Sequence, residues 1–287
     1  MTLSAIVQDW VSLFYTKERT SPHQHSISSA AIVCHSGALD NKRMIPIGDN
    51  LPTRRVAWMN YLIIGVTAAV WLFVQGGGGD PKLLAATVCN LGLVPGELTH
   101  LAHLGASIPL GPGAVCVVDN DAINWLTPLI SIFLHGSWGH IIGNMLFLAV
   151  FGDNIEDAMG HGRYLAFYLV CGVAAGIAHI ISSPASPVPT VGASGAISGI
   201  MGAYLVLFPR ANIRMLFFIF VANVRAWLVL IYWFLLQLFQ GLTELAPGPD
   251  VSGGVAVWAH VGGFVTGLLL VHSFVGRNLL ARTFRTR

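Results

Sequence analysis

Charged residues are scarce in this chain of 287 residues. Only 10% of the residues are Asp, Glu, Lys or Arg, whereas a soluble domain carries about 25%. With 54% hydrophobic residues, the chain has too few charges to cover a surface that faces water, so most of it must lie in lipid. The net charge of +2 includes no basic block, which argues against a nucleic acid as partner.

Cysteine is also rare, and its spacing gives no pattern. The four cysteines, none of which forms a metal-type pair, are Cys34, Cys89, Cys116 and Cys171. Their positions support neither a zinc site nor a disulfide framework, so we expect neither, and we expect no cofactor. The N-terminus lacks a basic region and carries Asp9, so it does not resemble a cleaved signal peptide.

Long apolar stretches dominate what is present. A helix needs about 20 apolar residues to cross the hydrocarbon core of a bilayer, and about 17 is a lower bound. Six stretches approach this length, and the fifth is the shortest: 57–74, a second that starts near Trp138, 164–181, 192–208, 226–240 and 255–275. The predicted fold is therefore all-α, a polytopic membrane protein with six transmembrane helices.

Lys and Arg mark the cytoplasmic side of a membrane protein. They gather before the first span, between the fourth and fifth spans and after the sixth, whereas the opposite connections carry only Lys82. Both termini are therefore predicted to be cytoplasmic. We divide the chain into a flexible or lightly structured cytoplasmic segment at 1–55, a membrane domain at 56–276 and a basic cytoplasmic tail at 277–287.

Polar residues within the predicted spans are candidates for function, because each polar group in lipid needs a partner or a cavity. These residues are His140, Asn144, His179, Ser194, Ser198, Gln237, Gln240, His260 and His272. No Asp, Glu, Lys or Arg lies deep in a span, which argues against ion-coupled transport and against a carboxylate metal site. Serine and histidine remain, and they are the minimum for nucleophilic catalysis.

Depth in the membrane separates four of these residues from the rest. Ser194, His260, His140 and Asn144 all lie within the first turns of spans that start on the non-cytoplasmic side. A serine in a membrane helix usually bonds to its own backbone, but four polar residues at one depth favour a site. For the other five polar residues we expect structural roles.

Pairs of small residues predict how two of the spans pack. Gly195 and Gly199 form a GxxxG pair in the fourth span, and Gly263 and Gly267 form another in the sixth. Such pairs let helix backbones approach closely in lipid. If these two faces meet, Ser194 lies beside His260.

Three motifs resemble the signatures of the rhomboid family of intramembrane serine proteases, in the family's order. They are "HGSWGHIIGNM" at 135–145, "GASGAISG" at 192–199 and "AHVGGFVTG" at 259–267. The resemblance covers roughly residues 55 to 275 and implies a six-helix rhomboid-like bundle. It implies that Ser194 is the nucleophile and His260 its general base.

The same resemblance assigns the remaining site residues. His140 and Asn144, together with the backbone N–H of Ser194, would bind the oxyanion, Gly192 would belong to the GxSG turn, and His135 would have a supporting role.

The chain departs from the family pattern at two places. Leu126 follows Trp125 where the family often has a Trp-Arg pair. Ser198 stands where an aromatic ring can stack on the base, so another side chain must hold His260.

The expected function is hydrolysis of peptide bonds in or near transmembrane segments of other membrane proteins. The alternative is a catalytically inactive rhomboid-like protein that binds client helices, and such a protein should lack Ser194 or His260. The expected partners are transmembrane substrates and membrane lipids, and the oligomeric state stays open. The style of the motifs favours a bacterial inner membrane, with the site on the non-cytoplasmic side.

Overall fold

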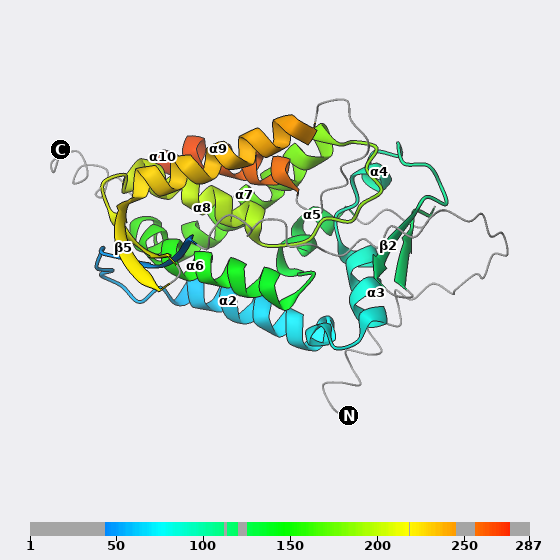
Figure 1. The fold of residues 1–287 in the computed structure, drawn as a ribbon, viewed down its shortest axis with the longest axis horizontal. Helices are drawn as coiled ribbons and strands as arrows, with labels where there is room; N and C mark the ends of the chain where they lie inside the picture. The colour runs from blue at the N-terminus through cyan, green and yellow to red at the C-terminus, as the bar shows by residue number, and fades with distance from the viewer. Residues whose placement is uncertain (1–43, 112–113, 120–124, 218, 245–255, 276–287) are drawn as a thin grey trace.

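The long helices of the described residues form an elongated bundle (Figure 1). The structure is a computed structural model that describes residues 44–111, 114–119, 125–217, 219–244 and 256–275. Each long helix lies where the sequence predicts a span: α2 (Trp58–Ala69, continued by the π-helical η1, Val70–Val74), α6 (Trp138–Met159), α7 (His161–Ser182), α8 (Ser194–Leu207), α9 (Ala226–Glu244) and α10 (Val257–Phe274).

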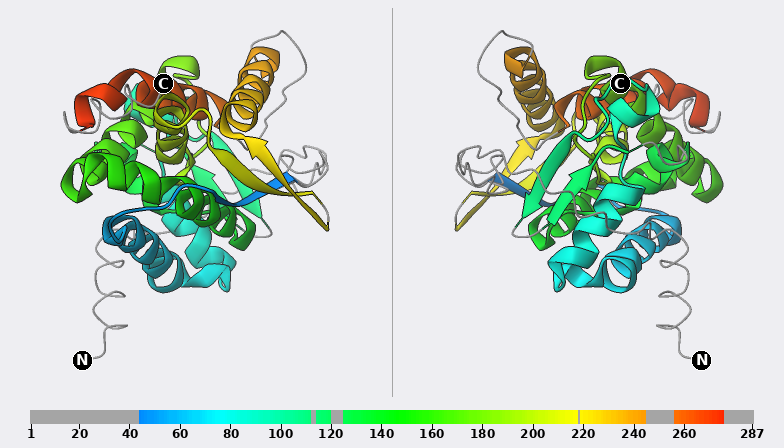
Figure 2. Two further views of the ribbon diagram at one scale, coloured as in Figure 1. Left: turned by 90° about the vertical axis from the view of Figure 1, so that its left-hand side faces the viewer. Right: turned by 90° about the vertical axis from the view of Figure 1, so that its right-hand side faces the viewer.

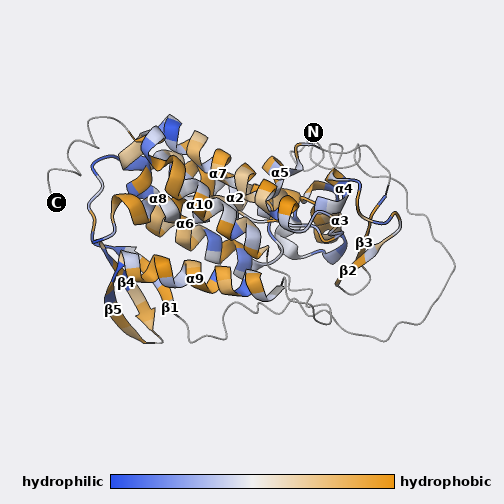
Figure 3. Cartoon of the chain, turned by 90° about the horizontal axis from the view of Figure 1, so that it is seen from above, coloured by the Kyte–Doolittle hydropathy of each residue, from blue (hydrophilic) through white to orange (hydrophobic). Residues whose placement is uncertain are grey.

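Three of these helices are long and apolar enough to cross a membrane by themselves, namely His161–Ser182, Ala226–Thr243 and Val257–Phe274. Trp58–Val74 and Ser194–Leu207 are shorter apolar helices. Orange, the colour of hydrophobic residues, covers most of the helices in Figure 3, and the mean hydropathy of the chain is +0.69. The chain is therefore an integral membrane protein, and the number of six crossings stays a prediction.

The prediction of an all-α chain is wrong in one respect, because the described residues also include five strands. At one end of the bundle, β1 (Met44–Asp49), β4 (Asn212–Phe217) and β5 (Phe220–Arg225) form an antiparallel sheet in the order β1-β4-β5. In β4 the side chains of Ile213 and Met215 are buried and that of Arg214 is exposed, which is the alternation of a half-buried strand. Seen along the bundle, the hairpin of β4 and β5 projects sideways from the helices (Figure 2).

The sheet also changes the account of the N-terminal segment. Part of the predicted flexible region at 1–55 is an ordered strand, because β1 pairs with β4 from Met44 to Asp49. The rest of that region up to residue 43, and the predicted tail at 277–287, lie outside the described residues.

The other end of the bundle carries the connection between α2 and α6. It contains α3 (Pro81–Leu91), α4 (Pro95–Leu98) and a hairpin of β2 (Ser107–Gly111) and β3 (Ala114–Val117), followed by the short α5 (Thr127–Ile130) and η3 (Ser131–Phe133). The 3-10 turn η2 (Gly76–Gly78) begins this connection.

A disulfide joins this connection internally, which corrects the expectation of no disulfide. Cys89 of α3 is bonded to Cys116 of β3, 27 residues away in the sequence. The spacing of the two cysteines in the sequence does not predict this bond, because they meet only where α3 packs against the β2–β3 hairpin. Disulfides persist in oxidising compartments, which agrees with the non-cytoplasmic side predicted for this connection from its single Lys82.

The glycine pairs of α8 and α10 lie against each other, so the prediction of this contact is confirmed. A Cβ atom added to Gly263 would meet the carbonyl oxygen of Gly195, and one added to Gly267 would meet that of Gly199. No side chain separates the two backbones at these points. The contact brings the start of α8 beside the start of α10.

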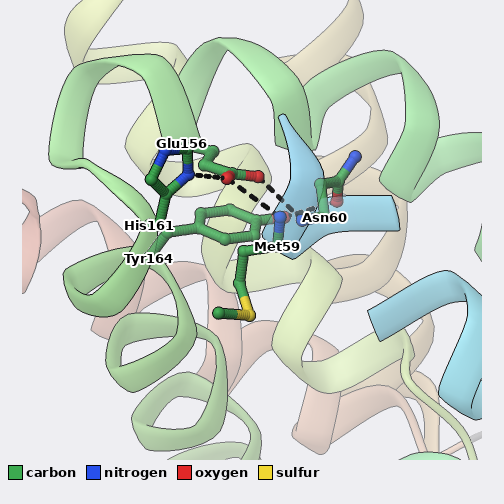
Figure 4. Close-up of polar contacts among 5 residues, drawn as sticks. All are labelled: Met59, Asn60, Glu156, His161 and Tyr164. Atoms are coloured by element: carbon green, nitrogen blue, oxygen red, sulfur yellow. Dashed lines mark hydrogen bonds and ion pairs between the residues drawn. The ribbon is translucent and has the colours of Figure 1, made fainter. Parts of the chain in front are cut away.

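A buried carboxylate joins three helices near the sheet end of the bundle (Figure 4). Glu156 of α6 accepts hydrogen bonds from the backbone N–H of Met59, at 3.0 Å, and of Asn60, at 2.7 Å, and also contacts the ring of His161. The hydroxyl of Tyr164 donates to the side-chain oxygen of Asn60 at 2.6 Å. Glu156 therefore caps the start of α2 and fixes it against α6 and α7.

Candidate active site

Ser194 is the first residue of α8 and lies two residues after Gly192, a glycine with an unusual backbone. Gly192 has a φ of +129°, a conformation that favours glycine, and its N–H donates to the carbonyl oxygen of Ser131 at 2.9 Å. The first N–H groups of a helix have no intrahelical partner. The turn thus presents both the hydroxyl and the backbone N–H of Ser194 at the helix start.

His260 lies in the first turn of α10 and contacts Ser194 directly. The distance from its Nε2 to the Oγ of Ser194 is 2.7 Å. Both side chains are half-buried. The structure therefore brings together the two residues that the sequence selects by depth and by the glycine pairs.

His140 and Asn144 lie one turn apart on α6 and face the same space beside Gly192. A Cβ atom placed on Gly192 would be 2.7 Å from the Nε2 of His140 and 3.6 Å from the Nδ2 of Asn144. The N–H of Gly136 donates to the Nδ1 of His140 at 3.4 Å, which leaves the proton on Nε2. The side chains of His140 and Asn144 thus bring two neutral donors beside Gly192, which lies two residues before Ser194.

His135 supports Asn144 from the loop before α6. Its ring is buried, and its Nε2 lies 2.9 Å from the Nδ2 of Asn144. The side chain of Gln75 holds the backbone of His135 through two hydrogen bonds of 2.8 Å. Sequence analysis did not select Gln75, whose only signal is a polar side chain directly after an apolar span.

Gln237 of α9 also lies at the site. Its Oε1 lies 2.8 Å from the Nδ1 of His260, although a purely structural role was expected. The hydroxyl of Ser198 donates to the carbonyl oxygen of Ser194 at 2.6 Å, which agrees with the structural role expected for it. The imidazole of His260 thus contacts Ser194 through its Nε2 and Gln237 through its Nδ1.

The remaining polar residues of the spans lie elsewhere. The Nε2 of His179 is 3.0 Å from the hydroxyl oxygen of Thr190, so it holds the loop that leads to α8. Gln240 and His272 are exposed on α9 and α10. These positions agree with the structural roles expected for the three residues.

The arrangement as a whole suits attack on a carbonyl group. It contains a hydroxyl, an imidazole that can take its proton, and donors for a developing oxyanion. Within the described residues, His, Cys, Asp and Glu form no group of three that could hold a metal ion.

Comparison with known proteins gives a consistent match. Residues 122–277 match the Rhomboid domain family, and this region contains all six candidate site residues. The chain is 30% identical over 230 residues to RHOMBOID-like protein 5 of Arabidopsis thaliana, covering 77% of this chain and 68% of that protein.

Two further relatives match shorter regions. Rhomboid protease GluP of Bacillus subtilis (strain 168) is 41% identical over 81 residues, which is 28% of this chain and 15% of that protein. RHOMBOID-like protein 12, mitochondrial, of Arabidopsis thaliana is 32% identical over 165 residues, or 50% of this chain and 49% of that protein. Because one relative is named as mitochondrial, the similarity does not support the predicted bacterial inner membrane over another membrane.

Proposed function

This chain belongs to the rhomboid family, and from that premise we propose that it is an intramembrane serine endopeptidase. It would hydrolyse peptide bonds in or near the transmembrane segments of other membrane proteins. The observation that carries the proposal is the distance of 2.7 Å between the Oγ of Ser194 and the Nε2 of His260, beside two converging donors.

The mechanism follows from the positions of these groups. As the Oγ of Ser194 attacks the substrate carbonyl, its proton passes to the Nε2 of His260. The oxyanion receives hydrogen bonds from the N–H of Ser194, the Nε2–H of His140 and the side-chain N–H of Asn144. His260 then gives its proton to the leaving amine, and a water molecule, deprotonated by His260, releases the acyl group from Ser194.

Neutral donors suit a site inside a membrane. A charged side chain in this setting is costly, whereas a neutral oxyanion donor stabilises the transition state by about 3 kcal/mol. The pair of His140 and Asn144 thus supplies the stabilisation without a buried charge.

The proposed topology has six crossings, with both termini in the cytoplasm and Ser194 near the opposite face. Two observations support it: the Arg residues around the sheet of β1, β4 and β5, and the disulfide at the other end of the bundle. The membrane domain would span 56–276.

The test is cleavage of a single-span reporter protein by the purified chain in proteoliposomes. The reporter carries small and helix-breaking residues near its outer end, because a helix must unwind locally before it can be cut. We expect the parent chain to cleave it and Ser194→Ala and His260→Ala to fall to background. Ser198→Ala is the matched control and should keep most of the activity.

Two results would overturn the proposal. Cleavage that persists in Ser194→Ala would assign the reaction to another nucleophile. A parent chain that binds the reporter helix without cleaving it would instead support the alternative, an inactive protein that binds client helices.

A further inference from the structure

The helix α9 contributes a polar side chain to a site otherwise formed by α6, α8 and α10. Gln237 lies in the otherwise apolar sequence "WFLLQLF", and its side chain is half-buried. Its Oε1 is 2.8 Å from the Nδ1 of His260, while the Nε2 of the same ring is 2.7 Å from the Oγ of Ser194. The imidazole therefore bridges a serine and an amide that belong to two other helices.

This bridge selects one protonation form of the ring. The amide oxygen of Gln237 can only accept a hydrogen bond, so the Nδ1 of His260 must carry the proton. The Nε2 then presents its lone pair to the hydroxyl of Ser194, which is the form that a general base requires. A rotated amide that donated to Nδ1 would place the proton on Nε2 and block the transfer.

The type of side chain fits its surroundings. In soluble serine proteases an aspartate fixes the tautomer of the histidine and stabilises the imidazolium. A carboxylate at this depth would be costly, whereas a glutamine gives the same acceptor without a charge.

A second side chain of α9 lies against the same ring. The centroid of Trp233, one turn before Gln237, is 5.9 Å from that of His260, and Trp233 also packs on Phe264 of α10. Trp233 thus contributes an aromatic contact that Ser198 cannot provide. One face of α9 supplies both the acceptor and the aromatic contact.

The position of α9 therefore affects the base. This helix lies on the outside of the bundle (Figure 2). Only 17% of its apolar stretch is buried, against 33% for α10. Its place is fixed by contacts with α10 and by further contacts with α8, β4 and β5.

We infer that Gln237 is a positioning residue that holds the imidazole of His260 in the tautomer and orientation required to accept the proton of Ser194. The inference rests on the proposed function of Ser194 and His260. Gln237 contacts neither the substrate nor the reacting atoms, and it acts through His260.

The experiment compares Gln237→Met with Gln240→Met in the proteoliposome cleavage assay. Methionine keeps the length of glutamine but has no strong acceptor, and Gln240 lies one turn away on the exposed side of α9. We expect Gln237→Met to lower kcat about 10²-fold with KM unchanged, a loss within the range of general-base catalysis. Gln240→Met should stay within about twofold of the parent, as surface substitutions usually do.

A third variant separates positioning from a merely structural role. Gln237→Glu keeps an acceptor and adds a charge that favours the imidazolium, so it should recover most of the kcat. It should also move the acidic limb of the pH profile of kcat/KM to higher pH. His140 and His179 are the other ionisable side chains whose charges act on His260, and both are unchanged in these variants.

The outcomes distinguish the inference from the proposed function. A Gln237→Met chain with the parent's kcat and pH profile would overturn the inference alone, as would equal losses in the two methionine variants. Equal losses in Gln237→Met and Gln237→Glu would also overturn it, because they would indicate a structural role. A parent chain without cleavage dependent on Ser194 would refute both.

Discussion

A single methyl group at Gly263 should separate the side chains of Ser194 and His260, the proposed nucleophile and base. In Gly263→Ala the new Cβ would meet the carbonyl oxygen of Gly195, whose carbonyl carbon would lie only 3.0 Å away. Both atoms belong to the backbone of α8 and cannot rotate away. The carbonyl oxygen would lie closer still to the new Cβ, so α8 and α10 must move apart by roughly 1 Å to restore normal contact distances of about 3.5 Å.

The expected effect on activity follows from this displacement. Gly195 follows Ser194, and Gly263 lies one turn after His260, so their Oγ–Nε2 distance of 2.7 Å should lengthen beyond hydrogen-bonding range. A misplacement of about 1 Å can cost about 10²-fold in rate, which corresponds to about 2.7 kcal/mol of the activation barrier. Overpacking should also lower the free energy of unfolding by about 1–3 kcal/mol.

The assay is kcat/KM for cleavage of the reporter, with thermal unfolding measured on the same preparations. Gly65→Ala in α2 is the matched control, because a Cβ there would have no neighbour within 4 Å. It should leave both quantities close to those of the parent. A Gly263→Ala chain with kcat/KM within about threefold of the parent would show that the glycine contact does not set the distance between Ser194 and His260.

Three further predictions concern the ends of the bundle. Removal of the buried Glu156 carboxylate in Glu156→Ala should lower the free energy of unfolding by about 3 kcal/mol, because backbone N–H groups at the start of α2 lose their acceptor; an unchanged thermal midpoint would contradict this. Burial, and then the charge of Asp119, raise the pKa of Glu97 from 4.5 to about 7. The folded state favours the protonated form of Glu97. The contribution of this carboxyl group to the free energy of unfolding is therefore complete below pH 4.5 and is lost as the pH rises through about 7. Thermal midpoints measured from pH 4 to 8 should therefore fall less steeply in Glu97→Gln than in the parent, and parallel curves would refute the prediction. Reduction of the Cys89–Cys116 disulfide should lower the free energy of unfolding by about 3–4 kcal/mol, as expected for a loop of 27 residues; alkylation followed by mass spectrometry checks the bond, and free thiols in the unreduced chain would contradict it.

The helices were predictable because an apolar stretch of this length has few alternatives to a membrane-spanning helix. The contact of α8 and α10 was also predictable, since the GxxxG pairs place small residues on one face of each helix. Depth then selected Ser194 and His260, and the structure places them in contact. These features depend on local sequence and on the geometry of the bilayer.

The features that sequence missed depend on contacts between distant segments. β1 forms only because residues 44–49 meet the hairpin after α8, more than 160 positions later. Cys89 and Cys116 meet only once α3 packs on the β2–β3 hairpin. The sequence could not distinguish Gln237 from Gln240, the other glutamine of α9. This helix is apolar on all sides, so the sequence does not show which of its faces turns toward His260.

Covalent labelling can show whether His260 activates the hydroxyl of Ser194. A fluorophosphonate probe reacts with a serine whose hydroxyl is activated by a neighbouring base. In proteoliposomes we expect one adduct, mapped by mass spectrometry to Ser194, and we expect it to be lost in both Ser194→Ala and His260→Ala. An adduct on another residue, or one on Ser194 that forms equally fast without His260, would contradict the claim that these two side chains act together.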